Sequence, residues 1–190
     1  MNLNTIFFIG PQGSGKGTQA KLLAKRLGFF YWEMGGILRE VAAGSTELGE
    51  KVKSLVDSGT LLQDEDLYAV VKMRANQISP QQGVIFDGIP RRLGQAEFLL
   101  DYLRSQGRAD FTTLYVSLPR EESLKRLLKR AEIEKRADDT KEKIEFRLQQ
   151  YENETVPVLE YLKNHGQFFE IDGQPSVEQV TKDINKALGL

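Results

Sequence analysis

The stretch Gly10-Pro11-Gln12-Gly13-Ser14-Gly15-Lys16-Gly17-Thr18 decides the fold of this chain. An apolar run, residues 5–9, leads into it, and a helix-forming run, residues 19–27, follows it. A strand, a glycine-rich turn and a helix in this order are typical of a phosphate-binding loop. The glycines let backbone N–H groups turn toward an anion, and the helix N-terminus adds partial positive charge. Lys16 adds a full charge on a flexible stem. We therefore predict a nucleoside triphosphate site here.

One position departs from the strict phosphate-loop pattern, which has Ser or Thr directly after the lysine. Here Gly17 follows Lys16, and Thr18 comes one place later, so the usual hydroxyl ligand of Mg²⁺ is displaced. The alternative is a glycine-rich turn that binds nothing. Three glycines in six residues, with the lysine in register and the right flanks, favour the nucleotide site.

Composition places the chain among ordinary globular proteins. Its 190 residues suit one domain, with 40% hydrophobic and 28% charged residues. A net charge of −1 gives no reason to expect nucleic acid or an anionic membrane as a partner. Without cysteine, the chain has no disulfide and no thiolate metal site. The first apolar run is too short for a signal peptide and ends in the phosphate loop, so we expect a cytoplasmic protein.

Strand and helix patterns alternate along the chain. This alternation predicts an α/β fold, in which a five-stranded parallel sheet has helices on both faces in three layers. Strands are expected over residues 5–9, 29–32, 83–87, 112–118 and 167–171. Helices are expected over residues 19–27, 37–41, 48–57, 64–77, 93–104, 120–130 and 176–188, and in a long segment after residue 139.

Helix ends and weak stretches refine this prediction. Gly35-Gly36 should break the structure before the helix at residue 37, and Ser45 should cap the helix at residue 48. Asp138-Asp139-Thr140 should cap the long helix, with Glu142 as the partner of Asp139, and Pro157 should bend or interrupt that helix. Residues 33–62 and 131–139 have weaker apolar patterning. We interpret them as insertions that could move on a core of residues 1–32, 63–130 and 140–190.

Asp87 comes directly after an apolar strand pattern, where ligands of doubly wound sheets bind. Enzymes with a phosphate loop place here the carboxylate that organises Mg²⁺. Asp also ends many strands in plain turns, but the residues that follow, Gly88-Ile89-Pro90-Arg91 and then Gln95, favour a site.

Several arginines follow the predicted glycine breaks or share a helix face. They are Arg39, Arg91, Arg126, Arg130, Arg136 and Arg147. Solvated surface charge is the alternative for any one of them. Phosphoryl transfer, however, concentrates negative charge that planar, permanently charged guanidinium groups suit. With one histidine and no Ser/His/Asp set, positioning and electrostatics must carry any catalysis.

These motifs together make the chain resemble the adenylate kinase family over essentially its whole length. The matching stretches are residues 10–19, Leu38-Arg39, residues 87–91, Gln95-Ala96-Glu97, residues 136–139 and Arg147-Leu148. The resemblance implies a P-loop core with a nucleoside monophosphate-binding segment, residues 33–62, and a short lid, residues 131–139. It also implies Mg²⁺-dependent phosphoryl transfer from ATP to AMP, which gives two ADP. A lid of this length lacks the family's zinc-bearing hairpin, so no zinc is expected.

The resemblance also implies roles for individual residues. The ATP phosphates would be held by Gly13, Ser14, Gly15, Lys16, Gly17, Thr18 and Arg130, with Arg126 against the adenine. The catalytic groups would be Lys16, Arg91, Arg130, Arg136 and Arg147. The AMP site would comprise Gly35, Arg39, Leu62, Gly88, Arg91, Gln95, Arg136 and Arg147. Asp87 would position Mg²⁺ through water, and the Ile89–Pro90 bond would be cis.

Three departures from the family pattern fall on the acceptor side. Met34-Gly35-Gly36 stands where the family has Thr-Gly-Asp, Ile89 and Arg92 replace Phe and Thr, and residues 61–63 differ from the usual Val-Pro or similar pair. The alternatives are therefore a kinase that prefers UMP or CMP, or a non-catalytic nucleotide-binding protein. Gln95 favours adenine, because its amide matches the donor–acceptor edge of that base. We expect small nucleotides as partners, no nucleic acid or membrane, and a monomer.

Overall fold

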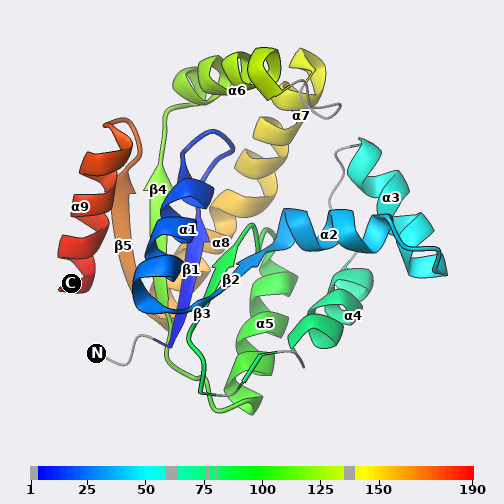
Figure 1. Cartoon of the computed structure of the whole chain (residues 1–190), viewed down its shortest axis with the longest axis horizontal. Helices are drawn as coiled ribbons and strands as arrows, with labels where there is room; N and C mark the ends of the chain where they lie inside the picture. Colours follow the sequence, from blue (N-terminus) through cyan, green and yellow to red (C-terminus); the bar gives the residue numbers. More distant parts are fainter. Residues whose placement is uncertain (1–3, 59–63, 76–77, 80, 135–139) are drawn as a thin grey trace.

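The computed structural model describes residues 4–58, 64–75, 78–79, 81–134 and 140–190 of the chain. At its centre is a parallel sheet of five strands in the order β2-β3-β1-β4-β5 (Figure 1). The strands are β1 (Thr5–Ile9), β2 (Phe30–Glu33), β3 (Val84–Asp87), β4 (Thr112–Ser117) and β5 (Gln167–Asp172). The fold class predicted from the sequence is confirmed.

The alternation of side chains along β1 explains the layers. Phe7 and Ile9 pack into one apolar core, and Ile6 and Phe8 pack into another on the opposite face of the sheet. The first core is closed by α4 (Asp64–Ala75), α5 (Leu93–Ser105) and α8 (Val156–His165). The second is closed by α1 (Lys16–Leu27) and α9 (Val177–Leu188). Two covered faces account for the continuous apolar character of the central strands.

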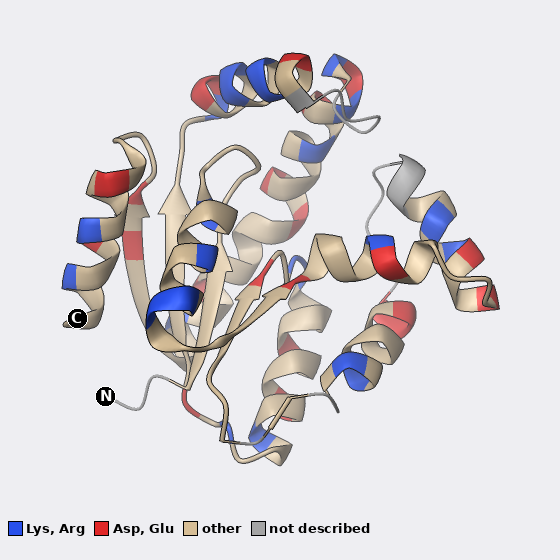
Figure 2. Ribbon diagram, viewed as in Figure 1, with Lys and Arg blue, Asp and Glu red and all other residues tan. Residues whose placement is uncertain are grey.

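The remaining helices lie around the carboxyl edge of the sheet. Helices α2 (Met34–Ala42) and α3 (Glu47–Ser58) extend to the side of β2, and α6 (Arg120–Glu134) and α7 (Lys141–Gln150) cross above the sheet (Figure 1). Lys, Arg, Asp and Glu lie mainly on the helices, and β1 and β4 carry no charged residue (Figure 2). Among the helices described, none is both long and apolar enough to cross a bilayer.

Two predictions about how helices begin were wrong. Gly35 and Gly36 do not break the chain but lie in the first turn of α2, which begins at Met34. The N–H groups of a first turn have no partner within the helix, so glycine disturbs the hydrogen-bond ladder least there. Helix α3 is capped by Thr46, whose Oγ1 accepts from the Gly49 N–H at 3.0 Å, and not by Ser45.

Helix α7 has Thr140 as its N-cap, and its Oγ1 accepts from the Lys143 N–H at 3.3 Å. Thr140 belongs to the stretch predicted to cap this helix, and the other two residues of that stretch, Asp138 and Asp139, lie outside the described residues. Helix α6 continues four residues past its predicted end at Arg130, into the segment interpreted as a lid. The interruption predicted from Pro157 is confirmed: a π-helical turn, Tyr151–Thr155, separates α7 from α8, and the proline lies in the first turn of α8. The division into core, acceptor segment and lid stays a prediction.

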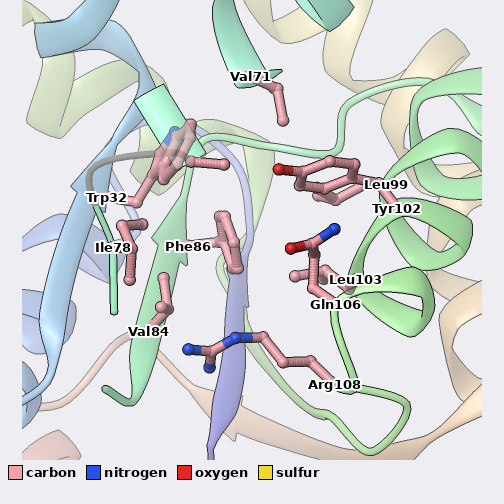
Figure 3. A pocket seen from close by; sticks show the side chains of 11 residues that line it. Trp32, Val71, Ile78, Val84, Phe86, Leu99, Tyr102, Leu103, Gln106 and Arg108 are labelled. Carbon is pink, nitrogen blue, oxygen red and sulfur yellow. The ribbon is translucent and has the colours of Figure 1, made fainter. Parts of the chain in front are cut away.

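A cavity of about 50 Å³ lies between the sheet and helices α4 and α5 (Figure 3). Trp32, Phe86 and Leu99 line it, and Arg108 lies at one end, where it donates to the carbonyls of Asn4, Ser79 and Gln82. This volume suits one or two water molecules rather than a substrate. This cavity is therefore too small to be the nucleotide site.

Candidate active site

The phosphate loop joins β1 to α1 and presents the helix N-terminus to the site. Gly15 is the N-cap residue in the left-handed conformation, with φ +84°, and a Cβ built there would meet nothing within 4 Å. Because glycine has no side chain, it cannot cap the first N–H groups of α1, which are left for an anion. Ser14 is 2% exposed, and its Oγ has no hydrogen-bond partner among the described residues. A buried hydroxyl without a partner is expected where a ligand completes the site.

Lys16 lies among other charged groups of the site. Its Nζ donates to the Pro11 carbonyl at 3.3 Å. Burial lowers the pKa of Lys16 from 10.5 to about 8; Asp87 opposes this change, and Arg91, Arg130 and Arg147 add to it. The three arginines come from the loop after β3, from α6 and from α7. The structure thus places three of the predicted catalytic arginines close enough to Lys16 to disfavour its charged form.

Asp87 lies beside the start of α1. It ends β3, is 7% exposed, and accepts a hydrogen bond from the Tyr31 hydroxyl at Oδ2, at 2.8 Å. A Cβ on Gly17 would lie 3.1 Å from the same oxygen. Burial and the Asp87 carboxylate both raise the pKa of Tyr31. Because Gly17 has no side chain, the Asp87 carboxylate can lie close to the start of α1. Tyr31 was not predicted, because nothing in an aromatic strand marks one hydroxyl as a partner of Asp87.

Arg91 is held by the turn that precedes it. Its Nε donates to the Gly88 carbonyl at 2.9 Å, and burial lowers the pKa of the guanidinium group. Gly88 has φ +82°, and a Cβ there would lie 3.3 Å from Arg91 Nη2. The Ile89–Pro90 bond between them is cis, so that prediction is confirmed. The Thr155 hydroxyl of the π-helical turn donates to the Arg91 carbonyl at 3.0 Å.

Arg39 lies on α2 beside a carboxylate that the sequence analysis missed. Its Nη2 is 3.0 Å from Oε1 of Glu33, and Lys21 approaches the other oxygen at 3.6 Å. A Cβ on Gly36 would lie 3.4 Å from Cδ of Glu33. Glu33 therefore supplies negative charge next to the position where the family pattern has Asp and this chain has glycine. The register of β2, which pairs Glu33 with Asp87, could have located it.

Met34 and Gln95 are fixed by neighbours. The Trp32 indole Nε1 donates to the sulfur of Met34 at 3.4 Å, and Met34 is 2% exposed. Gln95 is also buried; its Oε1 accepts from the Arg91 N–H at 2.9 Å, and its Nε2 donates to Asp64 at 3.1 Å. The predicted adenine-reading residue is thus already engaged at both ends of its amide.

Arg126 holds the loop that follows β5. Its two terminal nitrogens donate to the carbonyls of Gly173 and Gln174, both at 2.9 Å, and its Nε donates to Glu122. Contact with an ATP adenine stays a prediction for Arg126. Leu62 and Arg136, two other predicted site residues, lie outside the described residues.

A narrow cleft lies between the phosphate loop and the turn that carries Arg91. It is lined by residues of the phosphate loop, the Gly88–Arg91 turn and the π-helical turn, among them Gln12, Lys16, Arg91, Tyr151 and Thr155. The last two were not predicted as site residues, since their segment carries no nucleotide motif. Within the described part of the chain, no cluster of three or more His, Cys, Asp or Glu residues could by itself hold a metal ion.

A phosphate loop on a parallel sheet, with its lysine among arginines and one carboxylate, defines a P-loop phosphotransferase. Comparison with known proteins agrees: the family model described as adenylate kinase matches residues 8–167. The adenylate kinase of Thermus thermophilus is 38% identical over 185 residues, which cover 97% of both chains. The adenylate kinase of Phocaeicola vulgatus is 36% identical over 98% of both chains, and adenylate kinase 1 of Nostoc sp. is 36% identical over 98% of this chain and all of its own. The chain belongs to the adenylate kinase family.

Proposed function

We propose that the protein transfers the γ-phosphoryl group of ATP to AMP, reversibly and with Mg²⁺, giving two ADP. One observation carries this proposal: Lys16 and Arg91 line the same cleft beside the phosphate loop, and Arg130 and Arg147 lie near enough for their charges to act on the Lys16 ammonium group. A group of cations of this kind suits the several phosphates that two bound nucleotides bring together.

ATP is bound by the loop of residues 10–18. The backbone N–H groups of Gly13, Ser14, Gly15, Gly17 and Thr18 face its phosphates, Lys16 and Arg130 add charge, and Arg126 lies against the adenine. Arg126 suits this last role because its bonds to the loop after β5 hold the guanidinium plane in place.

Mg²⁺ fits the donor set next to the loop. It usually binds through one or two carboxylates, several waters and the substrate phosphates, so the single carboxylate of Asp87 is sufficient. Gly17 leaves the space beside Oδ2 of Asp87 free of a side chain. When bound, the ion neutralises charge on the β- and γ-phosphates. Asp87 would hold it through water, with Tyr31 orienting the carboxylate.

The transfer is an in-line displacement. A phosphate oxygen of AMP attacks the γ-phosphorus of ATP, a new P–O bond forms, and the bond from the γ-phosphorus to the bridging oxygen breaks as ADP leaves. Lys16, Arg91, Arg130, Arg136 and Arg147 stabilise the charge on the transferring group. Within the described part of the chain, the charges of Arg91, Arg130 and Arg147 already act on Lys16, so these four groups need little reorganisation during the reaction.

AMP is bound on the other side of the cleft. Arg39 and Arg91 grip its phosphate, Gln95 reads its adenine, and Gly35, Leu62 and Gly88 complete the pocket. Gly35 suits this role because a Cβ there would lie 3.3 Å from a terminal nitrogen of Arg39. Residues 33–62 and 131–139 would close over the core once both nucleotides are bound, which keeps water from the γ-phosphoryl group.

The proposal includes action as a monomer in the cytoplasm. All of the proposed groups belong to one chain, so the site needs no second copy.

The test is the formation of ADP from ATP and AMP by the purified protein, followed by phosphorus NMR. A panel of AMP, dAMP, GMP, CMP and UMP then ranks the acceptors by kcat/KM. We expect AMP first, with looser discrimination than in typical members, because Met34 cannot select a base by hydrogen bonding. Absence of ADP formation, or a pyrimidine nucleotide ranked first, would contradict the proposal.

A further inference from the structure

We propose that Asp64 is a positioning residue for acceptor selection: it fixes the direction of the Gln95 amide, and thereby makes the site prefer adenine to hypoxanthine or guanine. The inference rests on the proposed function, in which Gln95 reads the base of the acceptor. It concerns a residue 31 positions away in the sequence, at the first turn of α4.

The Gln95 amide is held at both ends by groups of opposite character. Its Oε1 accepts from the backbone N–H of Arg91 at 2.9 Å, and its Nε2 donates to Oδ1 of Asp64 at 3.1 Å. A backbone N–H can only donate, and an ionised carboxylate can only accept. A reversed amide would place its oxygen against the carboxylate and its NH₂ against an N–H. The two neighbours therefore permit one orientation.

Each end of the amide keeps one unused bonding position. The oxygen has a second lone pair, and the nitrogen has a second hydrogen. The fixed amide can thus accept one hydrogen bond and donate one. Adenine offers the complement, a donor at N6 and an acceptor at N1. Hypoxanthine and guanine offer the reverse, an acceptor at O6 and a donor at N1. The same glutamine turned by half a rotation would suit those bases instead.

A free glutamine amide could turn to match either edge, so glutamine alone discriminates weakly. The Arg91 N–H opposes the turn on one side only. Asp64 opposes it on the other, with a full negative charge that would face the amide oxygen. Selection between the two classes of purine therefore depends on Asp64 more than on any further contact to the base.

Asp64 is itself held in place. Nη1 of Arg92 lies 3.8 Å from its Oδ1. On its other side, a Cβ on Gly94 would lie 3.1 Å from its Oδ2. Tyr68 of α4 donates to the Gly94 carbonyl at 3.0 Å, which draws the starts of α4 and α5 together. Arg92 stands where the family pattern has Thr, so this departure strengthens the support behind Gln95.

The test compares AMP with inosine monophosphate as acceptors, with ATP as donor. The two have nearly the same size and differ at the 6-position and N1, so they isolate the direction of the amide. We expect the ratio of kcat/KM for AMP to that for inosine monophosphate to fall at least about tenfold in Asp64→Asn. An asparagine amide can turn with its neighbour and accept either orientation. Asp64→Ala removes the opposing charge altogether, so it should lower the ratio too.

The matched control is Glu65→Gln, which also removes a carboxylate from the first turn of α4 but lies on an exposed residue. It should keep the wild-type ratio. A structural role for Asp64 would lower both rates in proportion and leave the ratio unchanged, and that result overturns the inference. Because each ratio is internal to one preparation, partial unfolding does not obscure it, and either Asp64 variant suffices. A wild-type protein that does not turn over AMP would overturn the proposed function instead.

Discussion

Replacing Lys16 with methionine should make the protein more stable and nearly inactive. Burial and three arginines lower the pKa of Lys16 from 10.5 to about 8. At about 1.4 kcal/mol per tenfold, the folded protein disfavours the charged amine by about 3 kcal/mol near pH 7. Methionine has a similar length and no charge, so Lys16→Met should raise the free energy of unfolding by up to about 3 kcal/mol. It should also lower kcat by at least about two orders of magnitude.

The pH dependence identifies the cause of this gain. The folded pKa is lower than the unfolded value, so the unfolded chain binds more protons between pH 8 and 10.5. In that window the wild-type protein becomes more stable as pH rises, because the folded protein loses the unfavourable charge of Lys16. The advantage of Lys16→Met should therefore be largest near pH 7 and fall from about 3 to roughly 1.5 kcal/mol near pH 9.5.

Urea unfolding at both pH values measures the difference, and the control is Lys25→Met, an exposed lysine on the same helix. The control should change stability by less than about 0.5 kcal/mol and leave turnover intact. A Lys16→Met protein no more stable than the wild type at pH 7 would refute the inference that burial and like charges destabilise the charged Lys16. A gain of the same size at both pH values would refute its electrostatic origin.

Three further predictions concern the acceptor site, the core and the metal site. Glu33→Gln removes the half-exposed ion pair with Arg39, the arginine proposed to bind the AMP phosphate. The KM for AMP should therefore fall by up to about fivefold, and the KM for ATP should not change. A higher KM for AMP would contradict this. Leu99→Ala enlarges the cavity of about 50 Å³ and should cost about 3–5 kcal/mol by urea unfolding, against less than about 1 kcal/mol for the exposed Leu22→Ala. Equal losses would mean that the cavity wall is not rigid. Gly17→Ala puts a methyl group 3.1 Å from Asp87 and should raise several-fold the Mg²⁺ concentration needed for half-maximal rate, an effect absent if Asp87 is remote from the ion.

The fold could be predicted because its signals are local and periodic. The apolar run of residues 5–9 is buried on both faces, and its alternating side chains feed two separate cores. The end of each strand was predicted to within two residues for the same reason. Caps were less predictable. Ser45-Thr46 offers two capping residues in a row and Asp138-Asp139-Thr140 offers three, and the register of the following helix decides which of them caps it.

The contacts that tune the site could not be predicted from patterns. Tyr31 meets Asp87 across 56 positions, and Asp64 meets Gln95 across 31. Neither pair has a periodic signal, because polar contacts between elements depend on sheet register and helix packing rather than on local composition. The predictable part was the type of charge, since the chemistry of phosphoryl transfer favours lysine and arginine. Among the described residues, the predicted Arg91, Arg130 and Arg147 do lie close enough to act on Lys16.

The same charges explain why the site depends on the rest of the fold. Lys16 and Arg91 both have lowered pKa values because burial and like charges disfavour their ionised forms. Without a bound anion this cluster is destabilising, and among the described residues Asp87 acts against the lowered pKa of both Lys16 and Arg91. The two apolar cores on either side of the sheet supply the compensating free energy. A bound polyanionic nucleotide would offset the repulsion between these cations. Binding therefore relieves an unfavourable free energy of the folded protein, and this relief adds to the affinity for phosphates. A sequence selected for stability alone would not keep Lys16 there.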